Sequence, residues 1–204
     1  MLRNAIPVEP ITPARVQEAA DILGLAFQND PICTYMIPDP KHRAAVLHWM
    51  HSRWARVLME YGGAFITGGG EGVALWIPPR ARPGLTAYIR HGLLLVPFQL
   101  GWRNLARSAR VHLDVLRRQR EEISEPHWVL DVLGVAPAFQ RRGFGGALLA
   151  HVFRLADAGG YPCYVITHNV KNIAFYEAHG FRLIRMAHTL PDGPPTCSLR
   201  RPAQ

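Results

Sequence analysis

The chain has 204 residues, 49% of them hydrophobic and 19% charged, with a formal net charge of +8, which fits one globular domain over 1–204 with a substantial core. No apolar run approaches the roughly 20 residues that a membrane span needs, and residues 1–14 lack the apolar centre of a signal peptide, so we expect a cytoplasmic protein without a membrane partner. The three cysteines are far apart and form no C-x-x-C pair, which predicts buried reduced thiols.

The first half of the chain predicts two helices followed by a strand hairpin. Helical spacing predicts a helix over 12–27, with Thr12 as N-cap and Pro13 at its first position, then a proline-rich turn and a second helix from about 42 to 60. Short apolar runs at 64–67 and 73–77, joined by the glycine-rich segment GGGEG, predict a hairpin.

The second half predicts helical material and then alternating strands and helices. Helical patterns run from about 85 to 122, with an interruption near Pro97. The elements expected after it are a strand 128–135, a helix 145–158, a strand 163–167, a short helix 170–178 and a strand pair 181–187 and 196–200. This order indicates a mixed α/β fold.

The positive charge is almost entirely arginine, and its densest stretch is 102–120. A helix there would place one basic and one apolar face on opposite sides. The basic face would hold Arg103, Arg107 and Arg110, and the apolar face Leu105, Ala109, Leu113 and Leu116. Because aromatic interleaving and a known reading motif are both missing, we interpret the basic face as solvated and expect no nucleic-acid partner.

A strand-to-helix turn rich in arginine and glycine is the strongest functional signal. It reads QRRGFGG over 140–146, between an apolar strand and a run of good helix formers. It is not a P-loop, because no lysine follows the glycines, and it is not a dinucleotide fingerprint, because Leu148 stands at the place of the third glycine. The first amide groups of a helix lack internal acceptors, so this turn predicts an anion site for phosphate oxygens.

Two motifs in this order resemble the GCN5-related N-acetyltransferase (GNAT) superfamily. The turn matches its Q/R-x-x-G-x-G/A signature, and NIAFYEAHGF over 172–181 is similar to its N-x-x-x-x-Y-E-x-x-G-F segment with one residue fewer. Within the superfamily the chain looks like the bacterial puromycin N-acetyltransferase type. The resemblance implies a central mixed, mostly antiparallel sheet flanked by helices. It also implies a helical insertion at about 80–125 before the cofactor-binding strand, and an acetyl-coenzyme A-binding core at about 128–181.

The resemblance implies acetyl-coenzyme A as co-substrate, with no metal. The expected cofactor-binding residues are Leu133, Gly134, Val135, Gln140, Arg141, Arg142, Gly143, Phe144, Gly145, Gly146 and Asn172. The strand before the turn would bend away from its neighbour and expose backbone groups to the acetyl and pantetheine portions; glycine within a strand suits such a place.

Tyr176 matches the family's general acid. A phenol with a pKa of about 10 is protonated at neutral pH and can deliver a proton to a departing thiolate. The alternative is a core aromatic residue beside Phe175.

Asp131 is our candidate general base. Strict alternation along the strand would put Asp131 on the same face as Leu133. The alternative is a carboxylate that fixes a nearby arginine or backbone amide. His127 is a weaker candidate near the start of the strand, expected to be exposed.

The expected reaction is direct attack of an amine in a ternary complex, with a small-molecule acceptor. Protein or peptide amines and a non-catalytic acetyl-coenzyme A sensor remain as alternatives, as do another short acyl group and a homodimer. The turn at 191–195, the turn FQNDPICTYMIPDP and the insertion would rim the amine side. Five aromatic residues offer apolar surface there: Trp54, Trp76, Tyr88, Phe98 and Trp102. His42, His48 and His51 lack a completing carboxylate or cysteine, so we expect no metal site.

Overall fold

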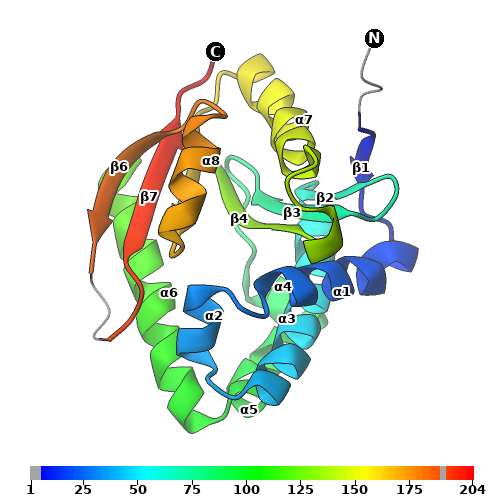
Figure 1. The fold of residues 1–204 in the computed structure, drawn as a ribbon, viewed down its shortest axis with the longest axis vertical. Coiled ribbons are helices and arrows are strands. Elements are labelled where there is room, and N and C mark those ends of the chain that lie inside the picture. The colour runs from blue at the N-terminus through cyan, green and yellow to red at the C-terminus, as the bar shows by residue number, and fades with distance from the viewer. Residues whose placement is uncertain (1–5, 189–191) are drawn as a thin grey trace.

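The computed structural model describes residues 6–188 and 192–204. The described strands form one seven-stranded sheet in the order β1-β2-β3-β4-β5-β7-β6 (Figure 1). They are β1 (Val8–Pro10), β2 (Ala64–Thr67), β3 (Gly72–Ile77), β4 (Trp128–Val135), β5 (Cys163–Thr167), β6 (Arg182–Ala187) and β7 (Thr196–Arg201). Only β4 and β5 pair in parallel among them. The predicted mixed, mostly antiparallel sheet is confirmed.

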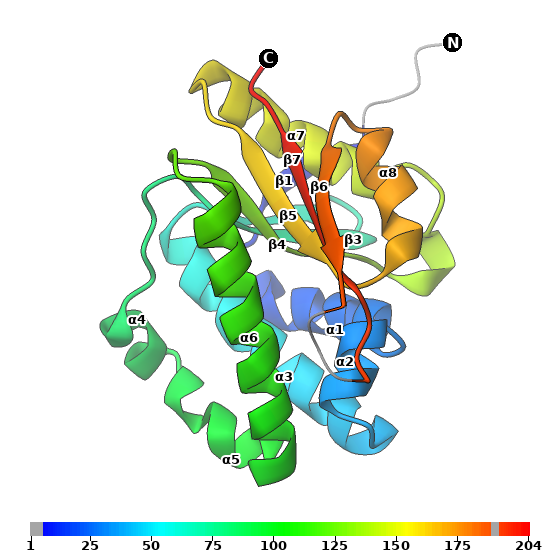
Figure 2. The same cartoon turned by 90° about the vertical axis from the view of Figure 1, so that its left-hand side faces the viewer.

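Helices cover both faces of this sheet (Figures 1 and 2). The α-helices are α1 (Val16–Phe27), α2 (Pro31–Met36), α3 (Pro40–Glu60), α4 (Leu85–Arg90), α5 (Val96–Leu100), α6 (Trp102–Glu122), α7 (Phe144–Ala158) and α8 (Ile173–Glu177). Short 3-10 turns are η1 (Pro13–Arg15), η2 (Leu93–Leu95), η3 (Pro137–Phe139) and η4 (Val170–Asn172). No helix among the described residues combines the length and apolarity that crossing a membrane would take.

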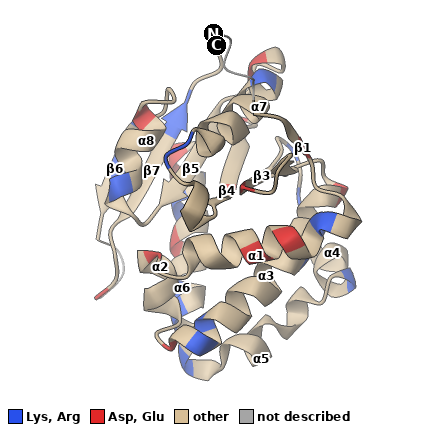
Figure 3. Ribbon diagram, turned by 45° about the vertical axis from the view of Figure 1, so that its right-hand side comes forward, with Lys and Arg blue, Asp and Glu red and all other residues tan. Residues whose placement is uncertain are grey.

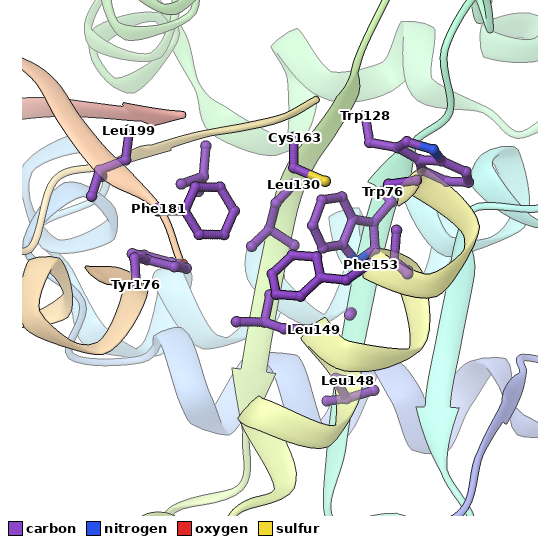
Figure 4. Close-up of a cluster of buried hydrophobic side chains, with 14 of the residues drawn as sticks. Trp76, Trp128, Leu130, Leu148, Leu149, Phe153, Cys163, Tyr176, Phe181 and Leu199 are labelled. Carbon is purple, nitrogen blue, oxygen red and sulfur yellow. The ribbon is translucent and has the colours of Figure 1, made fainter. Parts of the chain in front are cut away.

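Two hydrophobic clusters occupy the two faces of the sheet because strand side chains alternate. One cluster joins α1 and α3 to the sheet, with Leu23 and Ile66 fully buried in it. The other joins α7 and α8 to the opposite face. Figure 4 shows Leu149 and Phe153 of α7 packed with Trp76, and Tyr176 of α8 nearby beside Phe181. The three cysteines are buried and unpaired, as predicted.

The predicted helical segment after the hairpin is confirmed, but its breaks differ from our expectation. Pro97 does not interrupt a helix; it lies in the first turn of α5, where its missing N–H costs nothing. The chain breaks instead at Gly92 and Gly101, whose φ angles of +70° and +73° lie in a region that favours glycine. These helices form a layer beside α3 (Figure 2).

The apolar face predicted for α6 is correct only in its first part, where Leu105 packs against a small cluster of Ile37, Val46 and Leu100. Leu113 is 66% exposed, whereas Arg118 is completely buried and donates from Nε to Asp114 Oδ2 at 3.1 Å. In the second half of α6 the ion pair of Asp114 and Arg118, one helical turn apart, therefore packs inward where Leu113 was expected. Basic positions are spread over several elements (Figure 3).

Smaller differences concern the N-terminal half. Strand β1 and helix α2 were not predicted, because β1 has only three residues and α2 lies within the proline-rich turn. Asp30 caps α2 by accepting from the Ile32 amide at 3.0 Å. Thr12 stands at the predicted N-cap, but it makes no side-chain cap bond and a 3-10 turn precedes α1.

Candidate active site

The sheet opens between β4 and β5. The two strands pair only from Trp128 opposite Cys163 to Leu130 opposite Val165, although β4 continues to Val135 and β5 to Thr167. Below the point of separation lies a cavity of about 690 Å³ that reaches residues of α2, α3, α4, α6, α8 and both strands. Such a volume suits a small organic ligand. The predicted bending of the strand away from its neighbour is present.

Asp131 lies at an irregularity of β4 within this cavity. Leu75 of β3 pairs with Val132 and Trp76 pairs with Leu130, so Asp131 is the residue left out of the ladder. Its carboxylate Oδ2 accepts a hydrogen bond of 2.6 Å from Trp54 Nε1 of α3. The ring of Trp54 in turn stacks on Tyr88 of α4 at 6.1 Å between centroids.

This irregularity makes our expectation about strand faces wrong. Strict alternation would put Asp131 and Leu133 on one face, but Asp131 turns toward α3 while Leu133 packs with the α7 cluster. The extra residue reverses the alternation after position 131. Both side chains nevertheless line the cavity, because it passes through the opening between the strands.

The pKa of the Asp131 carboxyl is raised above its usual value. The cause is the protein that surrounds it within the cavity wall, which disfavours the ionised form; the Trp54 hydrogen bond and the nearby His112 oppose this in part. The side chain is still reached by water entering the cavity. A carboxyl group with a raised pKa and access to a ligand space has the properties of a proton acceptor.

Tyr176 reaches the same cavity from the opposite face of the sheet. It belongs to the α7 and α8 cluster, with Phe175 and Phe181 against its ring, and it is only 6% exposed. Burial, and secondarily the charge of Asp30, raise the pKa of its phenol well above the usual range. Tyr176 is thus both a core aromatic residue and a residue of the cavity wall. Its phenol stays protonated at neutral pH.

Asn172 lines the cavity one helical turn before Tyr176. Its Nδ2 lies 3.4 Å from the Thr167 hydroxyl at the end of β5. The structure therefore brings together Asp131, Leu133, Asn172 and Tyr176 around one space.

Gly134 and Val135 do not line the cavity. Gly134 is buried against α1, where an added Cβ would lie 2.7 Å from Leu23 Cδ2 and 3.0 Å from Ala26 Cβ. Close helix packing therefore explains this glycine, independently of a cofactor. Val135 ends the strand, opposite Gly72.

The glycine turn lies at the start of α7. Gly143 is the N-cap, with φ of +92°, and the preceding Arg141 has φ of +60°. Gln140 Nε2 donates to the Val135 carbonyl at 3.1 Å, which joins the turn to β4. Arg141 and Arg142 are exposed, so two cations stand beside the amide groups of a helix N-terminus. This set of donors and charges fits a phosphate group.

Gly145 lies against Phe175 of α8, and Gly146 lies against His179 in the turn after that helix. A Cβ on Gly145 would lie 3.2 Å from the Phe175 ring, and one on Gly146 would lie 2.7 Å from His179 Nε2. These two glycines therefore allow α7 to approach the helix that carries Tyr176. Phe144 packs edge-on against Phe139.

The sequence analysis did not predict the contact between Trp54 and Asp131. It also predicted more aromatic residues at the amine side than the structure places there. Of the five aromatic residues expected on the amine side, only Trp54 and Tyr88 line the cavity. Trp76 is buried in the core, and Phe98 and Trp102 are 81% and 84% exposed. The helical spacing of His51 and Trp54 was the one available signal, since residues three apart share a helix face and both line the cavity.

The candidate histidines are dispersed. His127 is half-buried and bonded to Gln119 and to the Glu125 carbonyl, and His42 Nε2 contacts the Gln99 carbonyl at 2.6 Å. His48 faces Asp21 at 3.2 Å, whereas His51 faces the cavity. The described residues contain no cluster of three or more His, Cys, Asp or Glu side chains suited to a metal ion.

Comparison with known proteins finds a family model that matches part of the chain and a distant relative. The family model described as "Acetyltransferase (GNAT) family" matches residues 108–181. An uncharacterized N-acetyltransferase of Schizosaccharomyces pombe is 23% identical over 178 residues, which cover 81% of this chain and 70% of that protein.

Solved structures share the fold. The structure named histone acetyltransferase HPA2 and related acetyltransferase from Corynebacterium glutamicum aligns with a TM-score of 0.68 at 22% identity, over 98% of this chain and 97% of that chain. An agmatine N-acetyltransferase aligns with a TM-score of 0.62 at 16% identity, over 97% of this chain and 99% of that chain. The fold is that of the GNAT enzymes.

Proposed function

With the GNAT family of N-acetyltransferases as premise, supported by the family model and the relative, we propose that this chain acetylates the amine of a small molecule from acetyl-coenzyme A. The amine attacks directly in a ternary complex. One observation carries the proposal: Asp131 and Tyr176 line a single cavity at the opening between β4 and β5, although they belong to opposite faces of the sheet. An acceptor in this cavity would have a base on one side and an acid on the other.

The residues around the opening fit the two ends of acetyl-coenzyme A. Exposed Arg141 and Arg142 and the first amide groups of α7 would hold the pyrophosphate. The part of β4 beyond Leu130, with Leu133 at its centre, is not paired with β5, so its backbone would hold the acetyl and pantetheine end together with Asn172. When bound, acetyl-coenzyme A supplies the thioester carbonyl that the amine attacks and the sulfur that leaves as a thiolate.

Asp131 accepts the proton that the acceptor must lose. At neutral pH an alkyl amine is mostly ammonium, and only its neutral form has the lone pair needed for attack. The raised pKa of the Asp131 carboxyl makes it a stronger base than an aspartate with the ordinary pKa, and the bond from Trp54 Nε1 orients it. Backbone N–H groups of β4 beyond the opening can donate to the oxygen that gains negative charge.

Tyr176 supplies a proton to the departing sulfur. Its burial raises the pKa of the phenol, and the same surroundings disfavour a thiolate, so the pKa of the thiol would rise there too. Because both pKa values rise, the proton transfer from the phenol to the thiolate does not become much less favourable. The ammonium loses two protons in all. The first goes to Asp131 before the attack, and the second leaves the nitrogen as the tetrahedral intermediate collapses and replaces on Tyr176 the proton that the phenol gives to sulfur; Asp131 then releases its proton to solvent.

Two neighbours differ in the acceptor that their names state. One is named for histone acetylation and one for agmatine acetylation. We propose a small molecule because the candidate base faces a cavity walled by α3, α4 and α6. The likeness to the puromycin N-acetyltransferase type is part of this proposal.

The test is release of free thiol from acetyl-coenzyme A with a panel of small amines, histone-type peptides and N-terminal peptides. We expect thiol release with at least one small amine, lost in Asp131→Asn and Tyr176→Phe. Turnover confined to peptides would refute the small-molecule acceptor. Tight binding of acetyl-coenzyme A by calorimetry without transfer to any amine would instead support a sensor.

A further inference from the structure

The cavity carries a charge pattern opposite to that of the whole chain. The chain has a formal net charge of +8, yet the described residues that line the cavity include no lysine or arginine. They include two aspartates, Asp131 and Asp30. A ligand carboxylate would therefore find no lysine or arginine in the wall itself, although the buried Arg118 acts on His168 and Tyr164, whereas a ligand ammonium would face two acidic groups.

The lining histidines do not reverse this pattern. Burial lowers the pKa of His51 and of His168 to about 4 each, so both imidazoles are neutral at physiological pH. The third lining histidine, His112, lies close enough to Asp131 to lower the pKa of that carboxyl.

Three residues that line the cavity each carry a buried polar atom without a hydrogen-bond partner within the described residues, which a ligand group can meet after rotation of the side chain. The atoms are His51 Nδ1 on α3, Ser108 Oγ on α6 and His168 Nε2 after β5. His51 and His168 are 7% and 9% exposed. Buried polar atoms are usually satisfied, so these three point to a ligand group that completes them. A hydroxyl or a neutral imidazole pairs well with hydroxyl, carbonyl or amide groups.

We propose that the acceptor is a small cationic amine that lacks a carboxylate and carries a neutral hydrogen-bonding group on an apolar body. The ammonium lies at Asp131, and the neutral group meets one or more of His51, Ser108 and His168. The apolar body contacts the leucine, methionine and aromatic side chains of the wall. This inference rests on the proposed function and extends it to a substrate class.

The test compares compounds that share one carbon skeleton. L-phenylalaninol and L-phenylalanine differ in a hydroxymethyl against a carboxylate, and 2-phenylethylamine lacks both; L-leucinol, L-leucine and isopentylamine repeat the series on an aliphatic body. Thiol release gives kcat/KM per free amine, and calorimetry on coenzyme A-loaded protein gives binding without turnover. For the better-bound skeleton we expect the amino alcohol to exceed the amino acid by about 100-fold and the simple amine by about tenfold.

Substitutions locate the neutral group. We expect at least one of His51→Leu, Ser108→Ala and His168→Leu to abolish the advantage of the amino alcohol over the simple amine, leaving the simple amine unchanged. His48→Leu is the matched control, because His48 lies on the same helix but faces Asp21 at the surface. Ser108→Ala removes only one oxygen, so it tests the idea even if a histidine variant fails to fold.

The possible failures are distinguishable. Amino acids used or bound as well as amino alcohols would overturn the inference while the acetyltransferase proposal stands. A hydroxyl advantage that persists in all three variants, or binding of none of the six compounds, would also overturn it. Absence of acetyl-coenzyme A binding or of transfer to any amine would overturn the proposed function itself.

Discussion

Replacing Trp54 with phenylalanine tests whether Asp131 is a base whose pKa the protein sets. The change removes the Nε1–H that donates to Asp131 Oδ2 at 2.6 Å. It keeps an aromatic ring on α3 that can still stack on Tyr88, whose ring is nearly parallel to that of Trp54. The packing is therefore largely preserved while the donor is lost.

The size of the effect follows from that single hydrogen bond. A bond to an ionised group contributes about 1.5–3 kcal/mol. One pKa unit corresponds to about 1.4 kcal/mol, so complete loss would raise the pKa of Asp131 by about one to two units. Water reaches this carboxyl from the cavity and replaces part of the bond, so we expect about one unit.

The assay is kcat/KM against pH for one amine. If deprotonated Asp131 is the active form, a higher pKa moves the acidic limb of the profile upward by about one pH unit. Activity on that limb then falls about tenfold, while the plateau at high pH is retained. Trp49→Phe is the matched control: it removes a tryptophan of the same helix that stacks under Arg53 at 4.2 Å.

An acidic limb that stays in place in Trp54→Phe would refute this reasoning. A lowered plateau with an unmoved limb would mean that Trp54 acts through packing alone. A shift of equal size in Trp49→Phe would mean that the pKa responds to general loosening of α3.

Three further predictions test the neighbouring assignments. The protein around Asp131 raises its folded-state pKa above its unfolded value of about 4, although the residue is exposed to the cavity, so folding favours the protonated form and stability is lost as pH rises from about 4 through the raised pKa. Asp131→Asn stays neutral and keeps an oxygen for Trp54, so its Tm relative to that of the wild type should rise as the pH increases from about 4 through the raised pKa, while kcat/KM falls; a lower Tm at every pH would mark a structural carboxylate. Tyr176→Phe should lower kcat by about 100-fold or more with little change in acetyl-coenzyme A affinity by calorimetry, and full activity would exclude Tyr176 as the acid. At Gly143→Ala the new Cβ has room, because the nearest atom is Ile6 Cδ1 at 3.8 Å. The φ angle of +92° costs an alanine about 1–2 kcal/mol of folding free energy, so stability and the affinity for acetyl-coenzyme A should both fall. Gly160→Ala, at φ of +68° beyond the other end of α7, is its control and should lose stability alone; equal affinity losses would contradict a phosphate site at the turn.

Local pattern was sufficient for most elements of the fold. Strands β2, β4 and β5 have the predicted bounds, and α7 begins one residue before its predicted start. The reason is that alternation, helical spacing and glycine turns act over a few neighbouring residues. The resemblance carried by the QRRGFGG turn and the FYEAHGF segment likewise depends on short stretches, and the GNAT fold that it implied is confirmed.

Only the tertiary structure decided how the candidate site is assembled. The donor to Asp131 stands 77 residues away in sequence, and a single unpaired residue in β4 turned Asp131 away from the face that alternation assigned to it. In α6, Arg118 is buried because Asp114 pairs with it against the sheet, and the pattern of leucines gave no sign of that partner. Hydrophobic pattern specifies which side chains tend to leave water, but pairings between distant elements depend on register and on the charges and volumes that meet there. The sequence by itself therefore determined most elements of the fold and the position of the glycine turn, while packing across the sheet determined which side chains line the cavity.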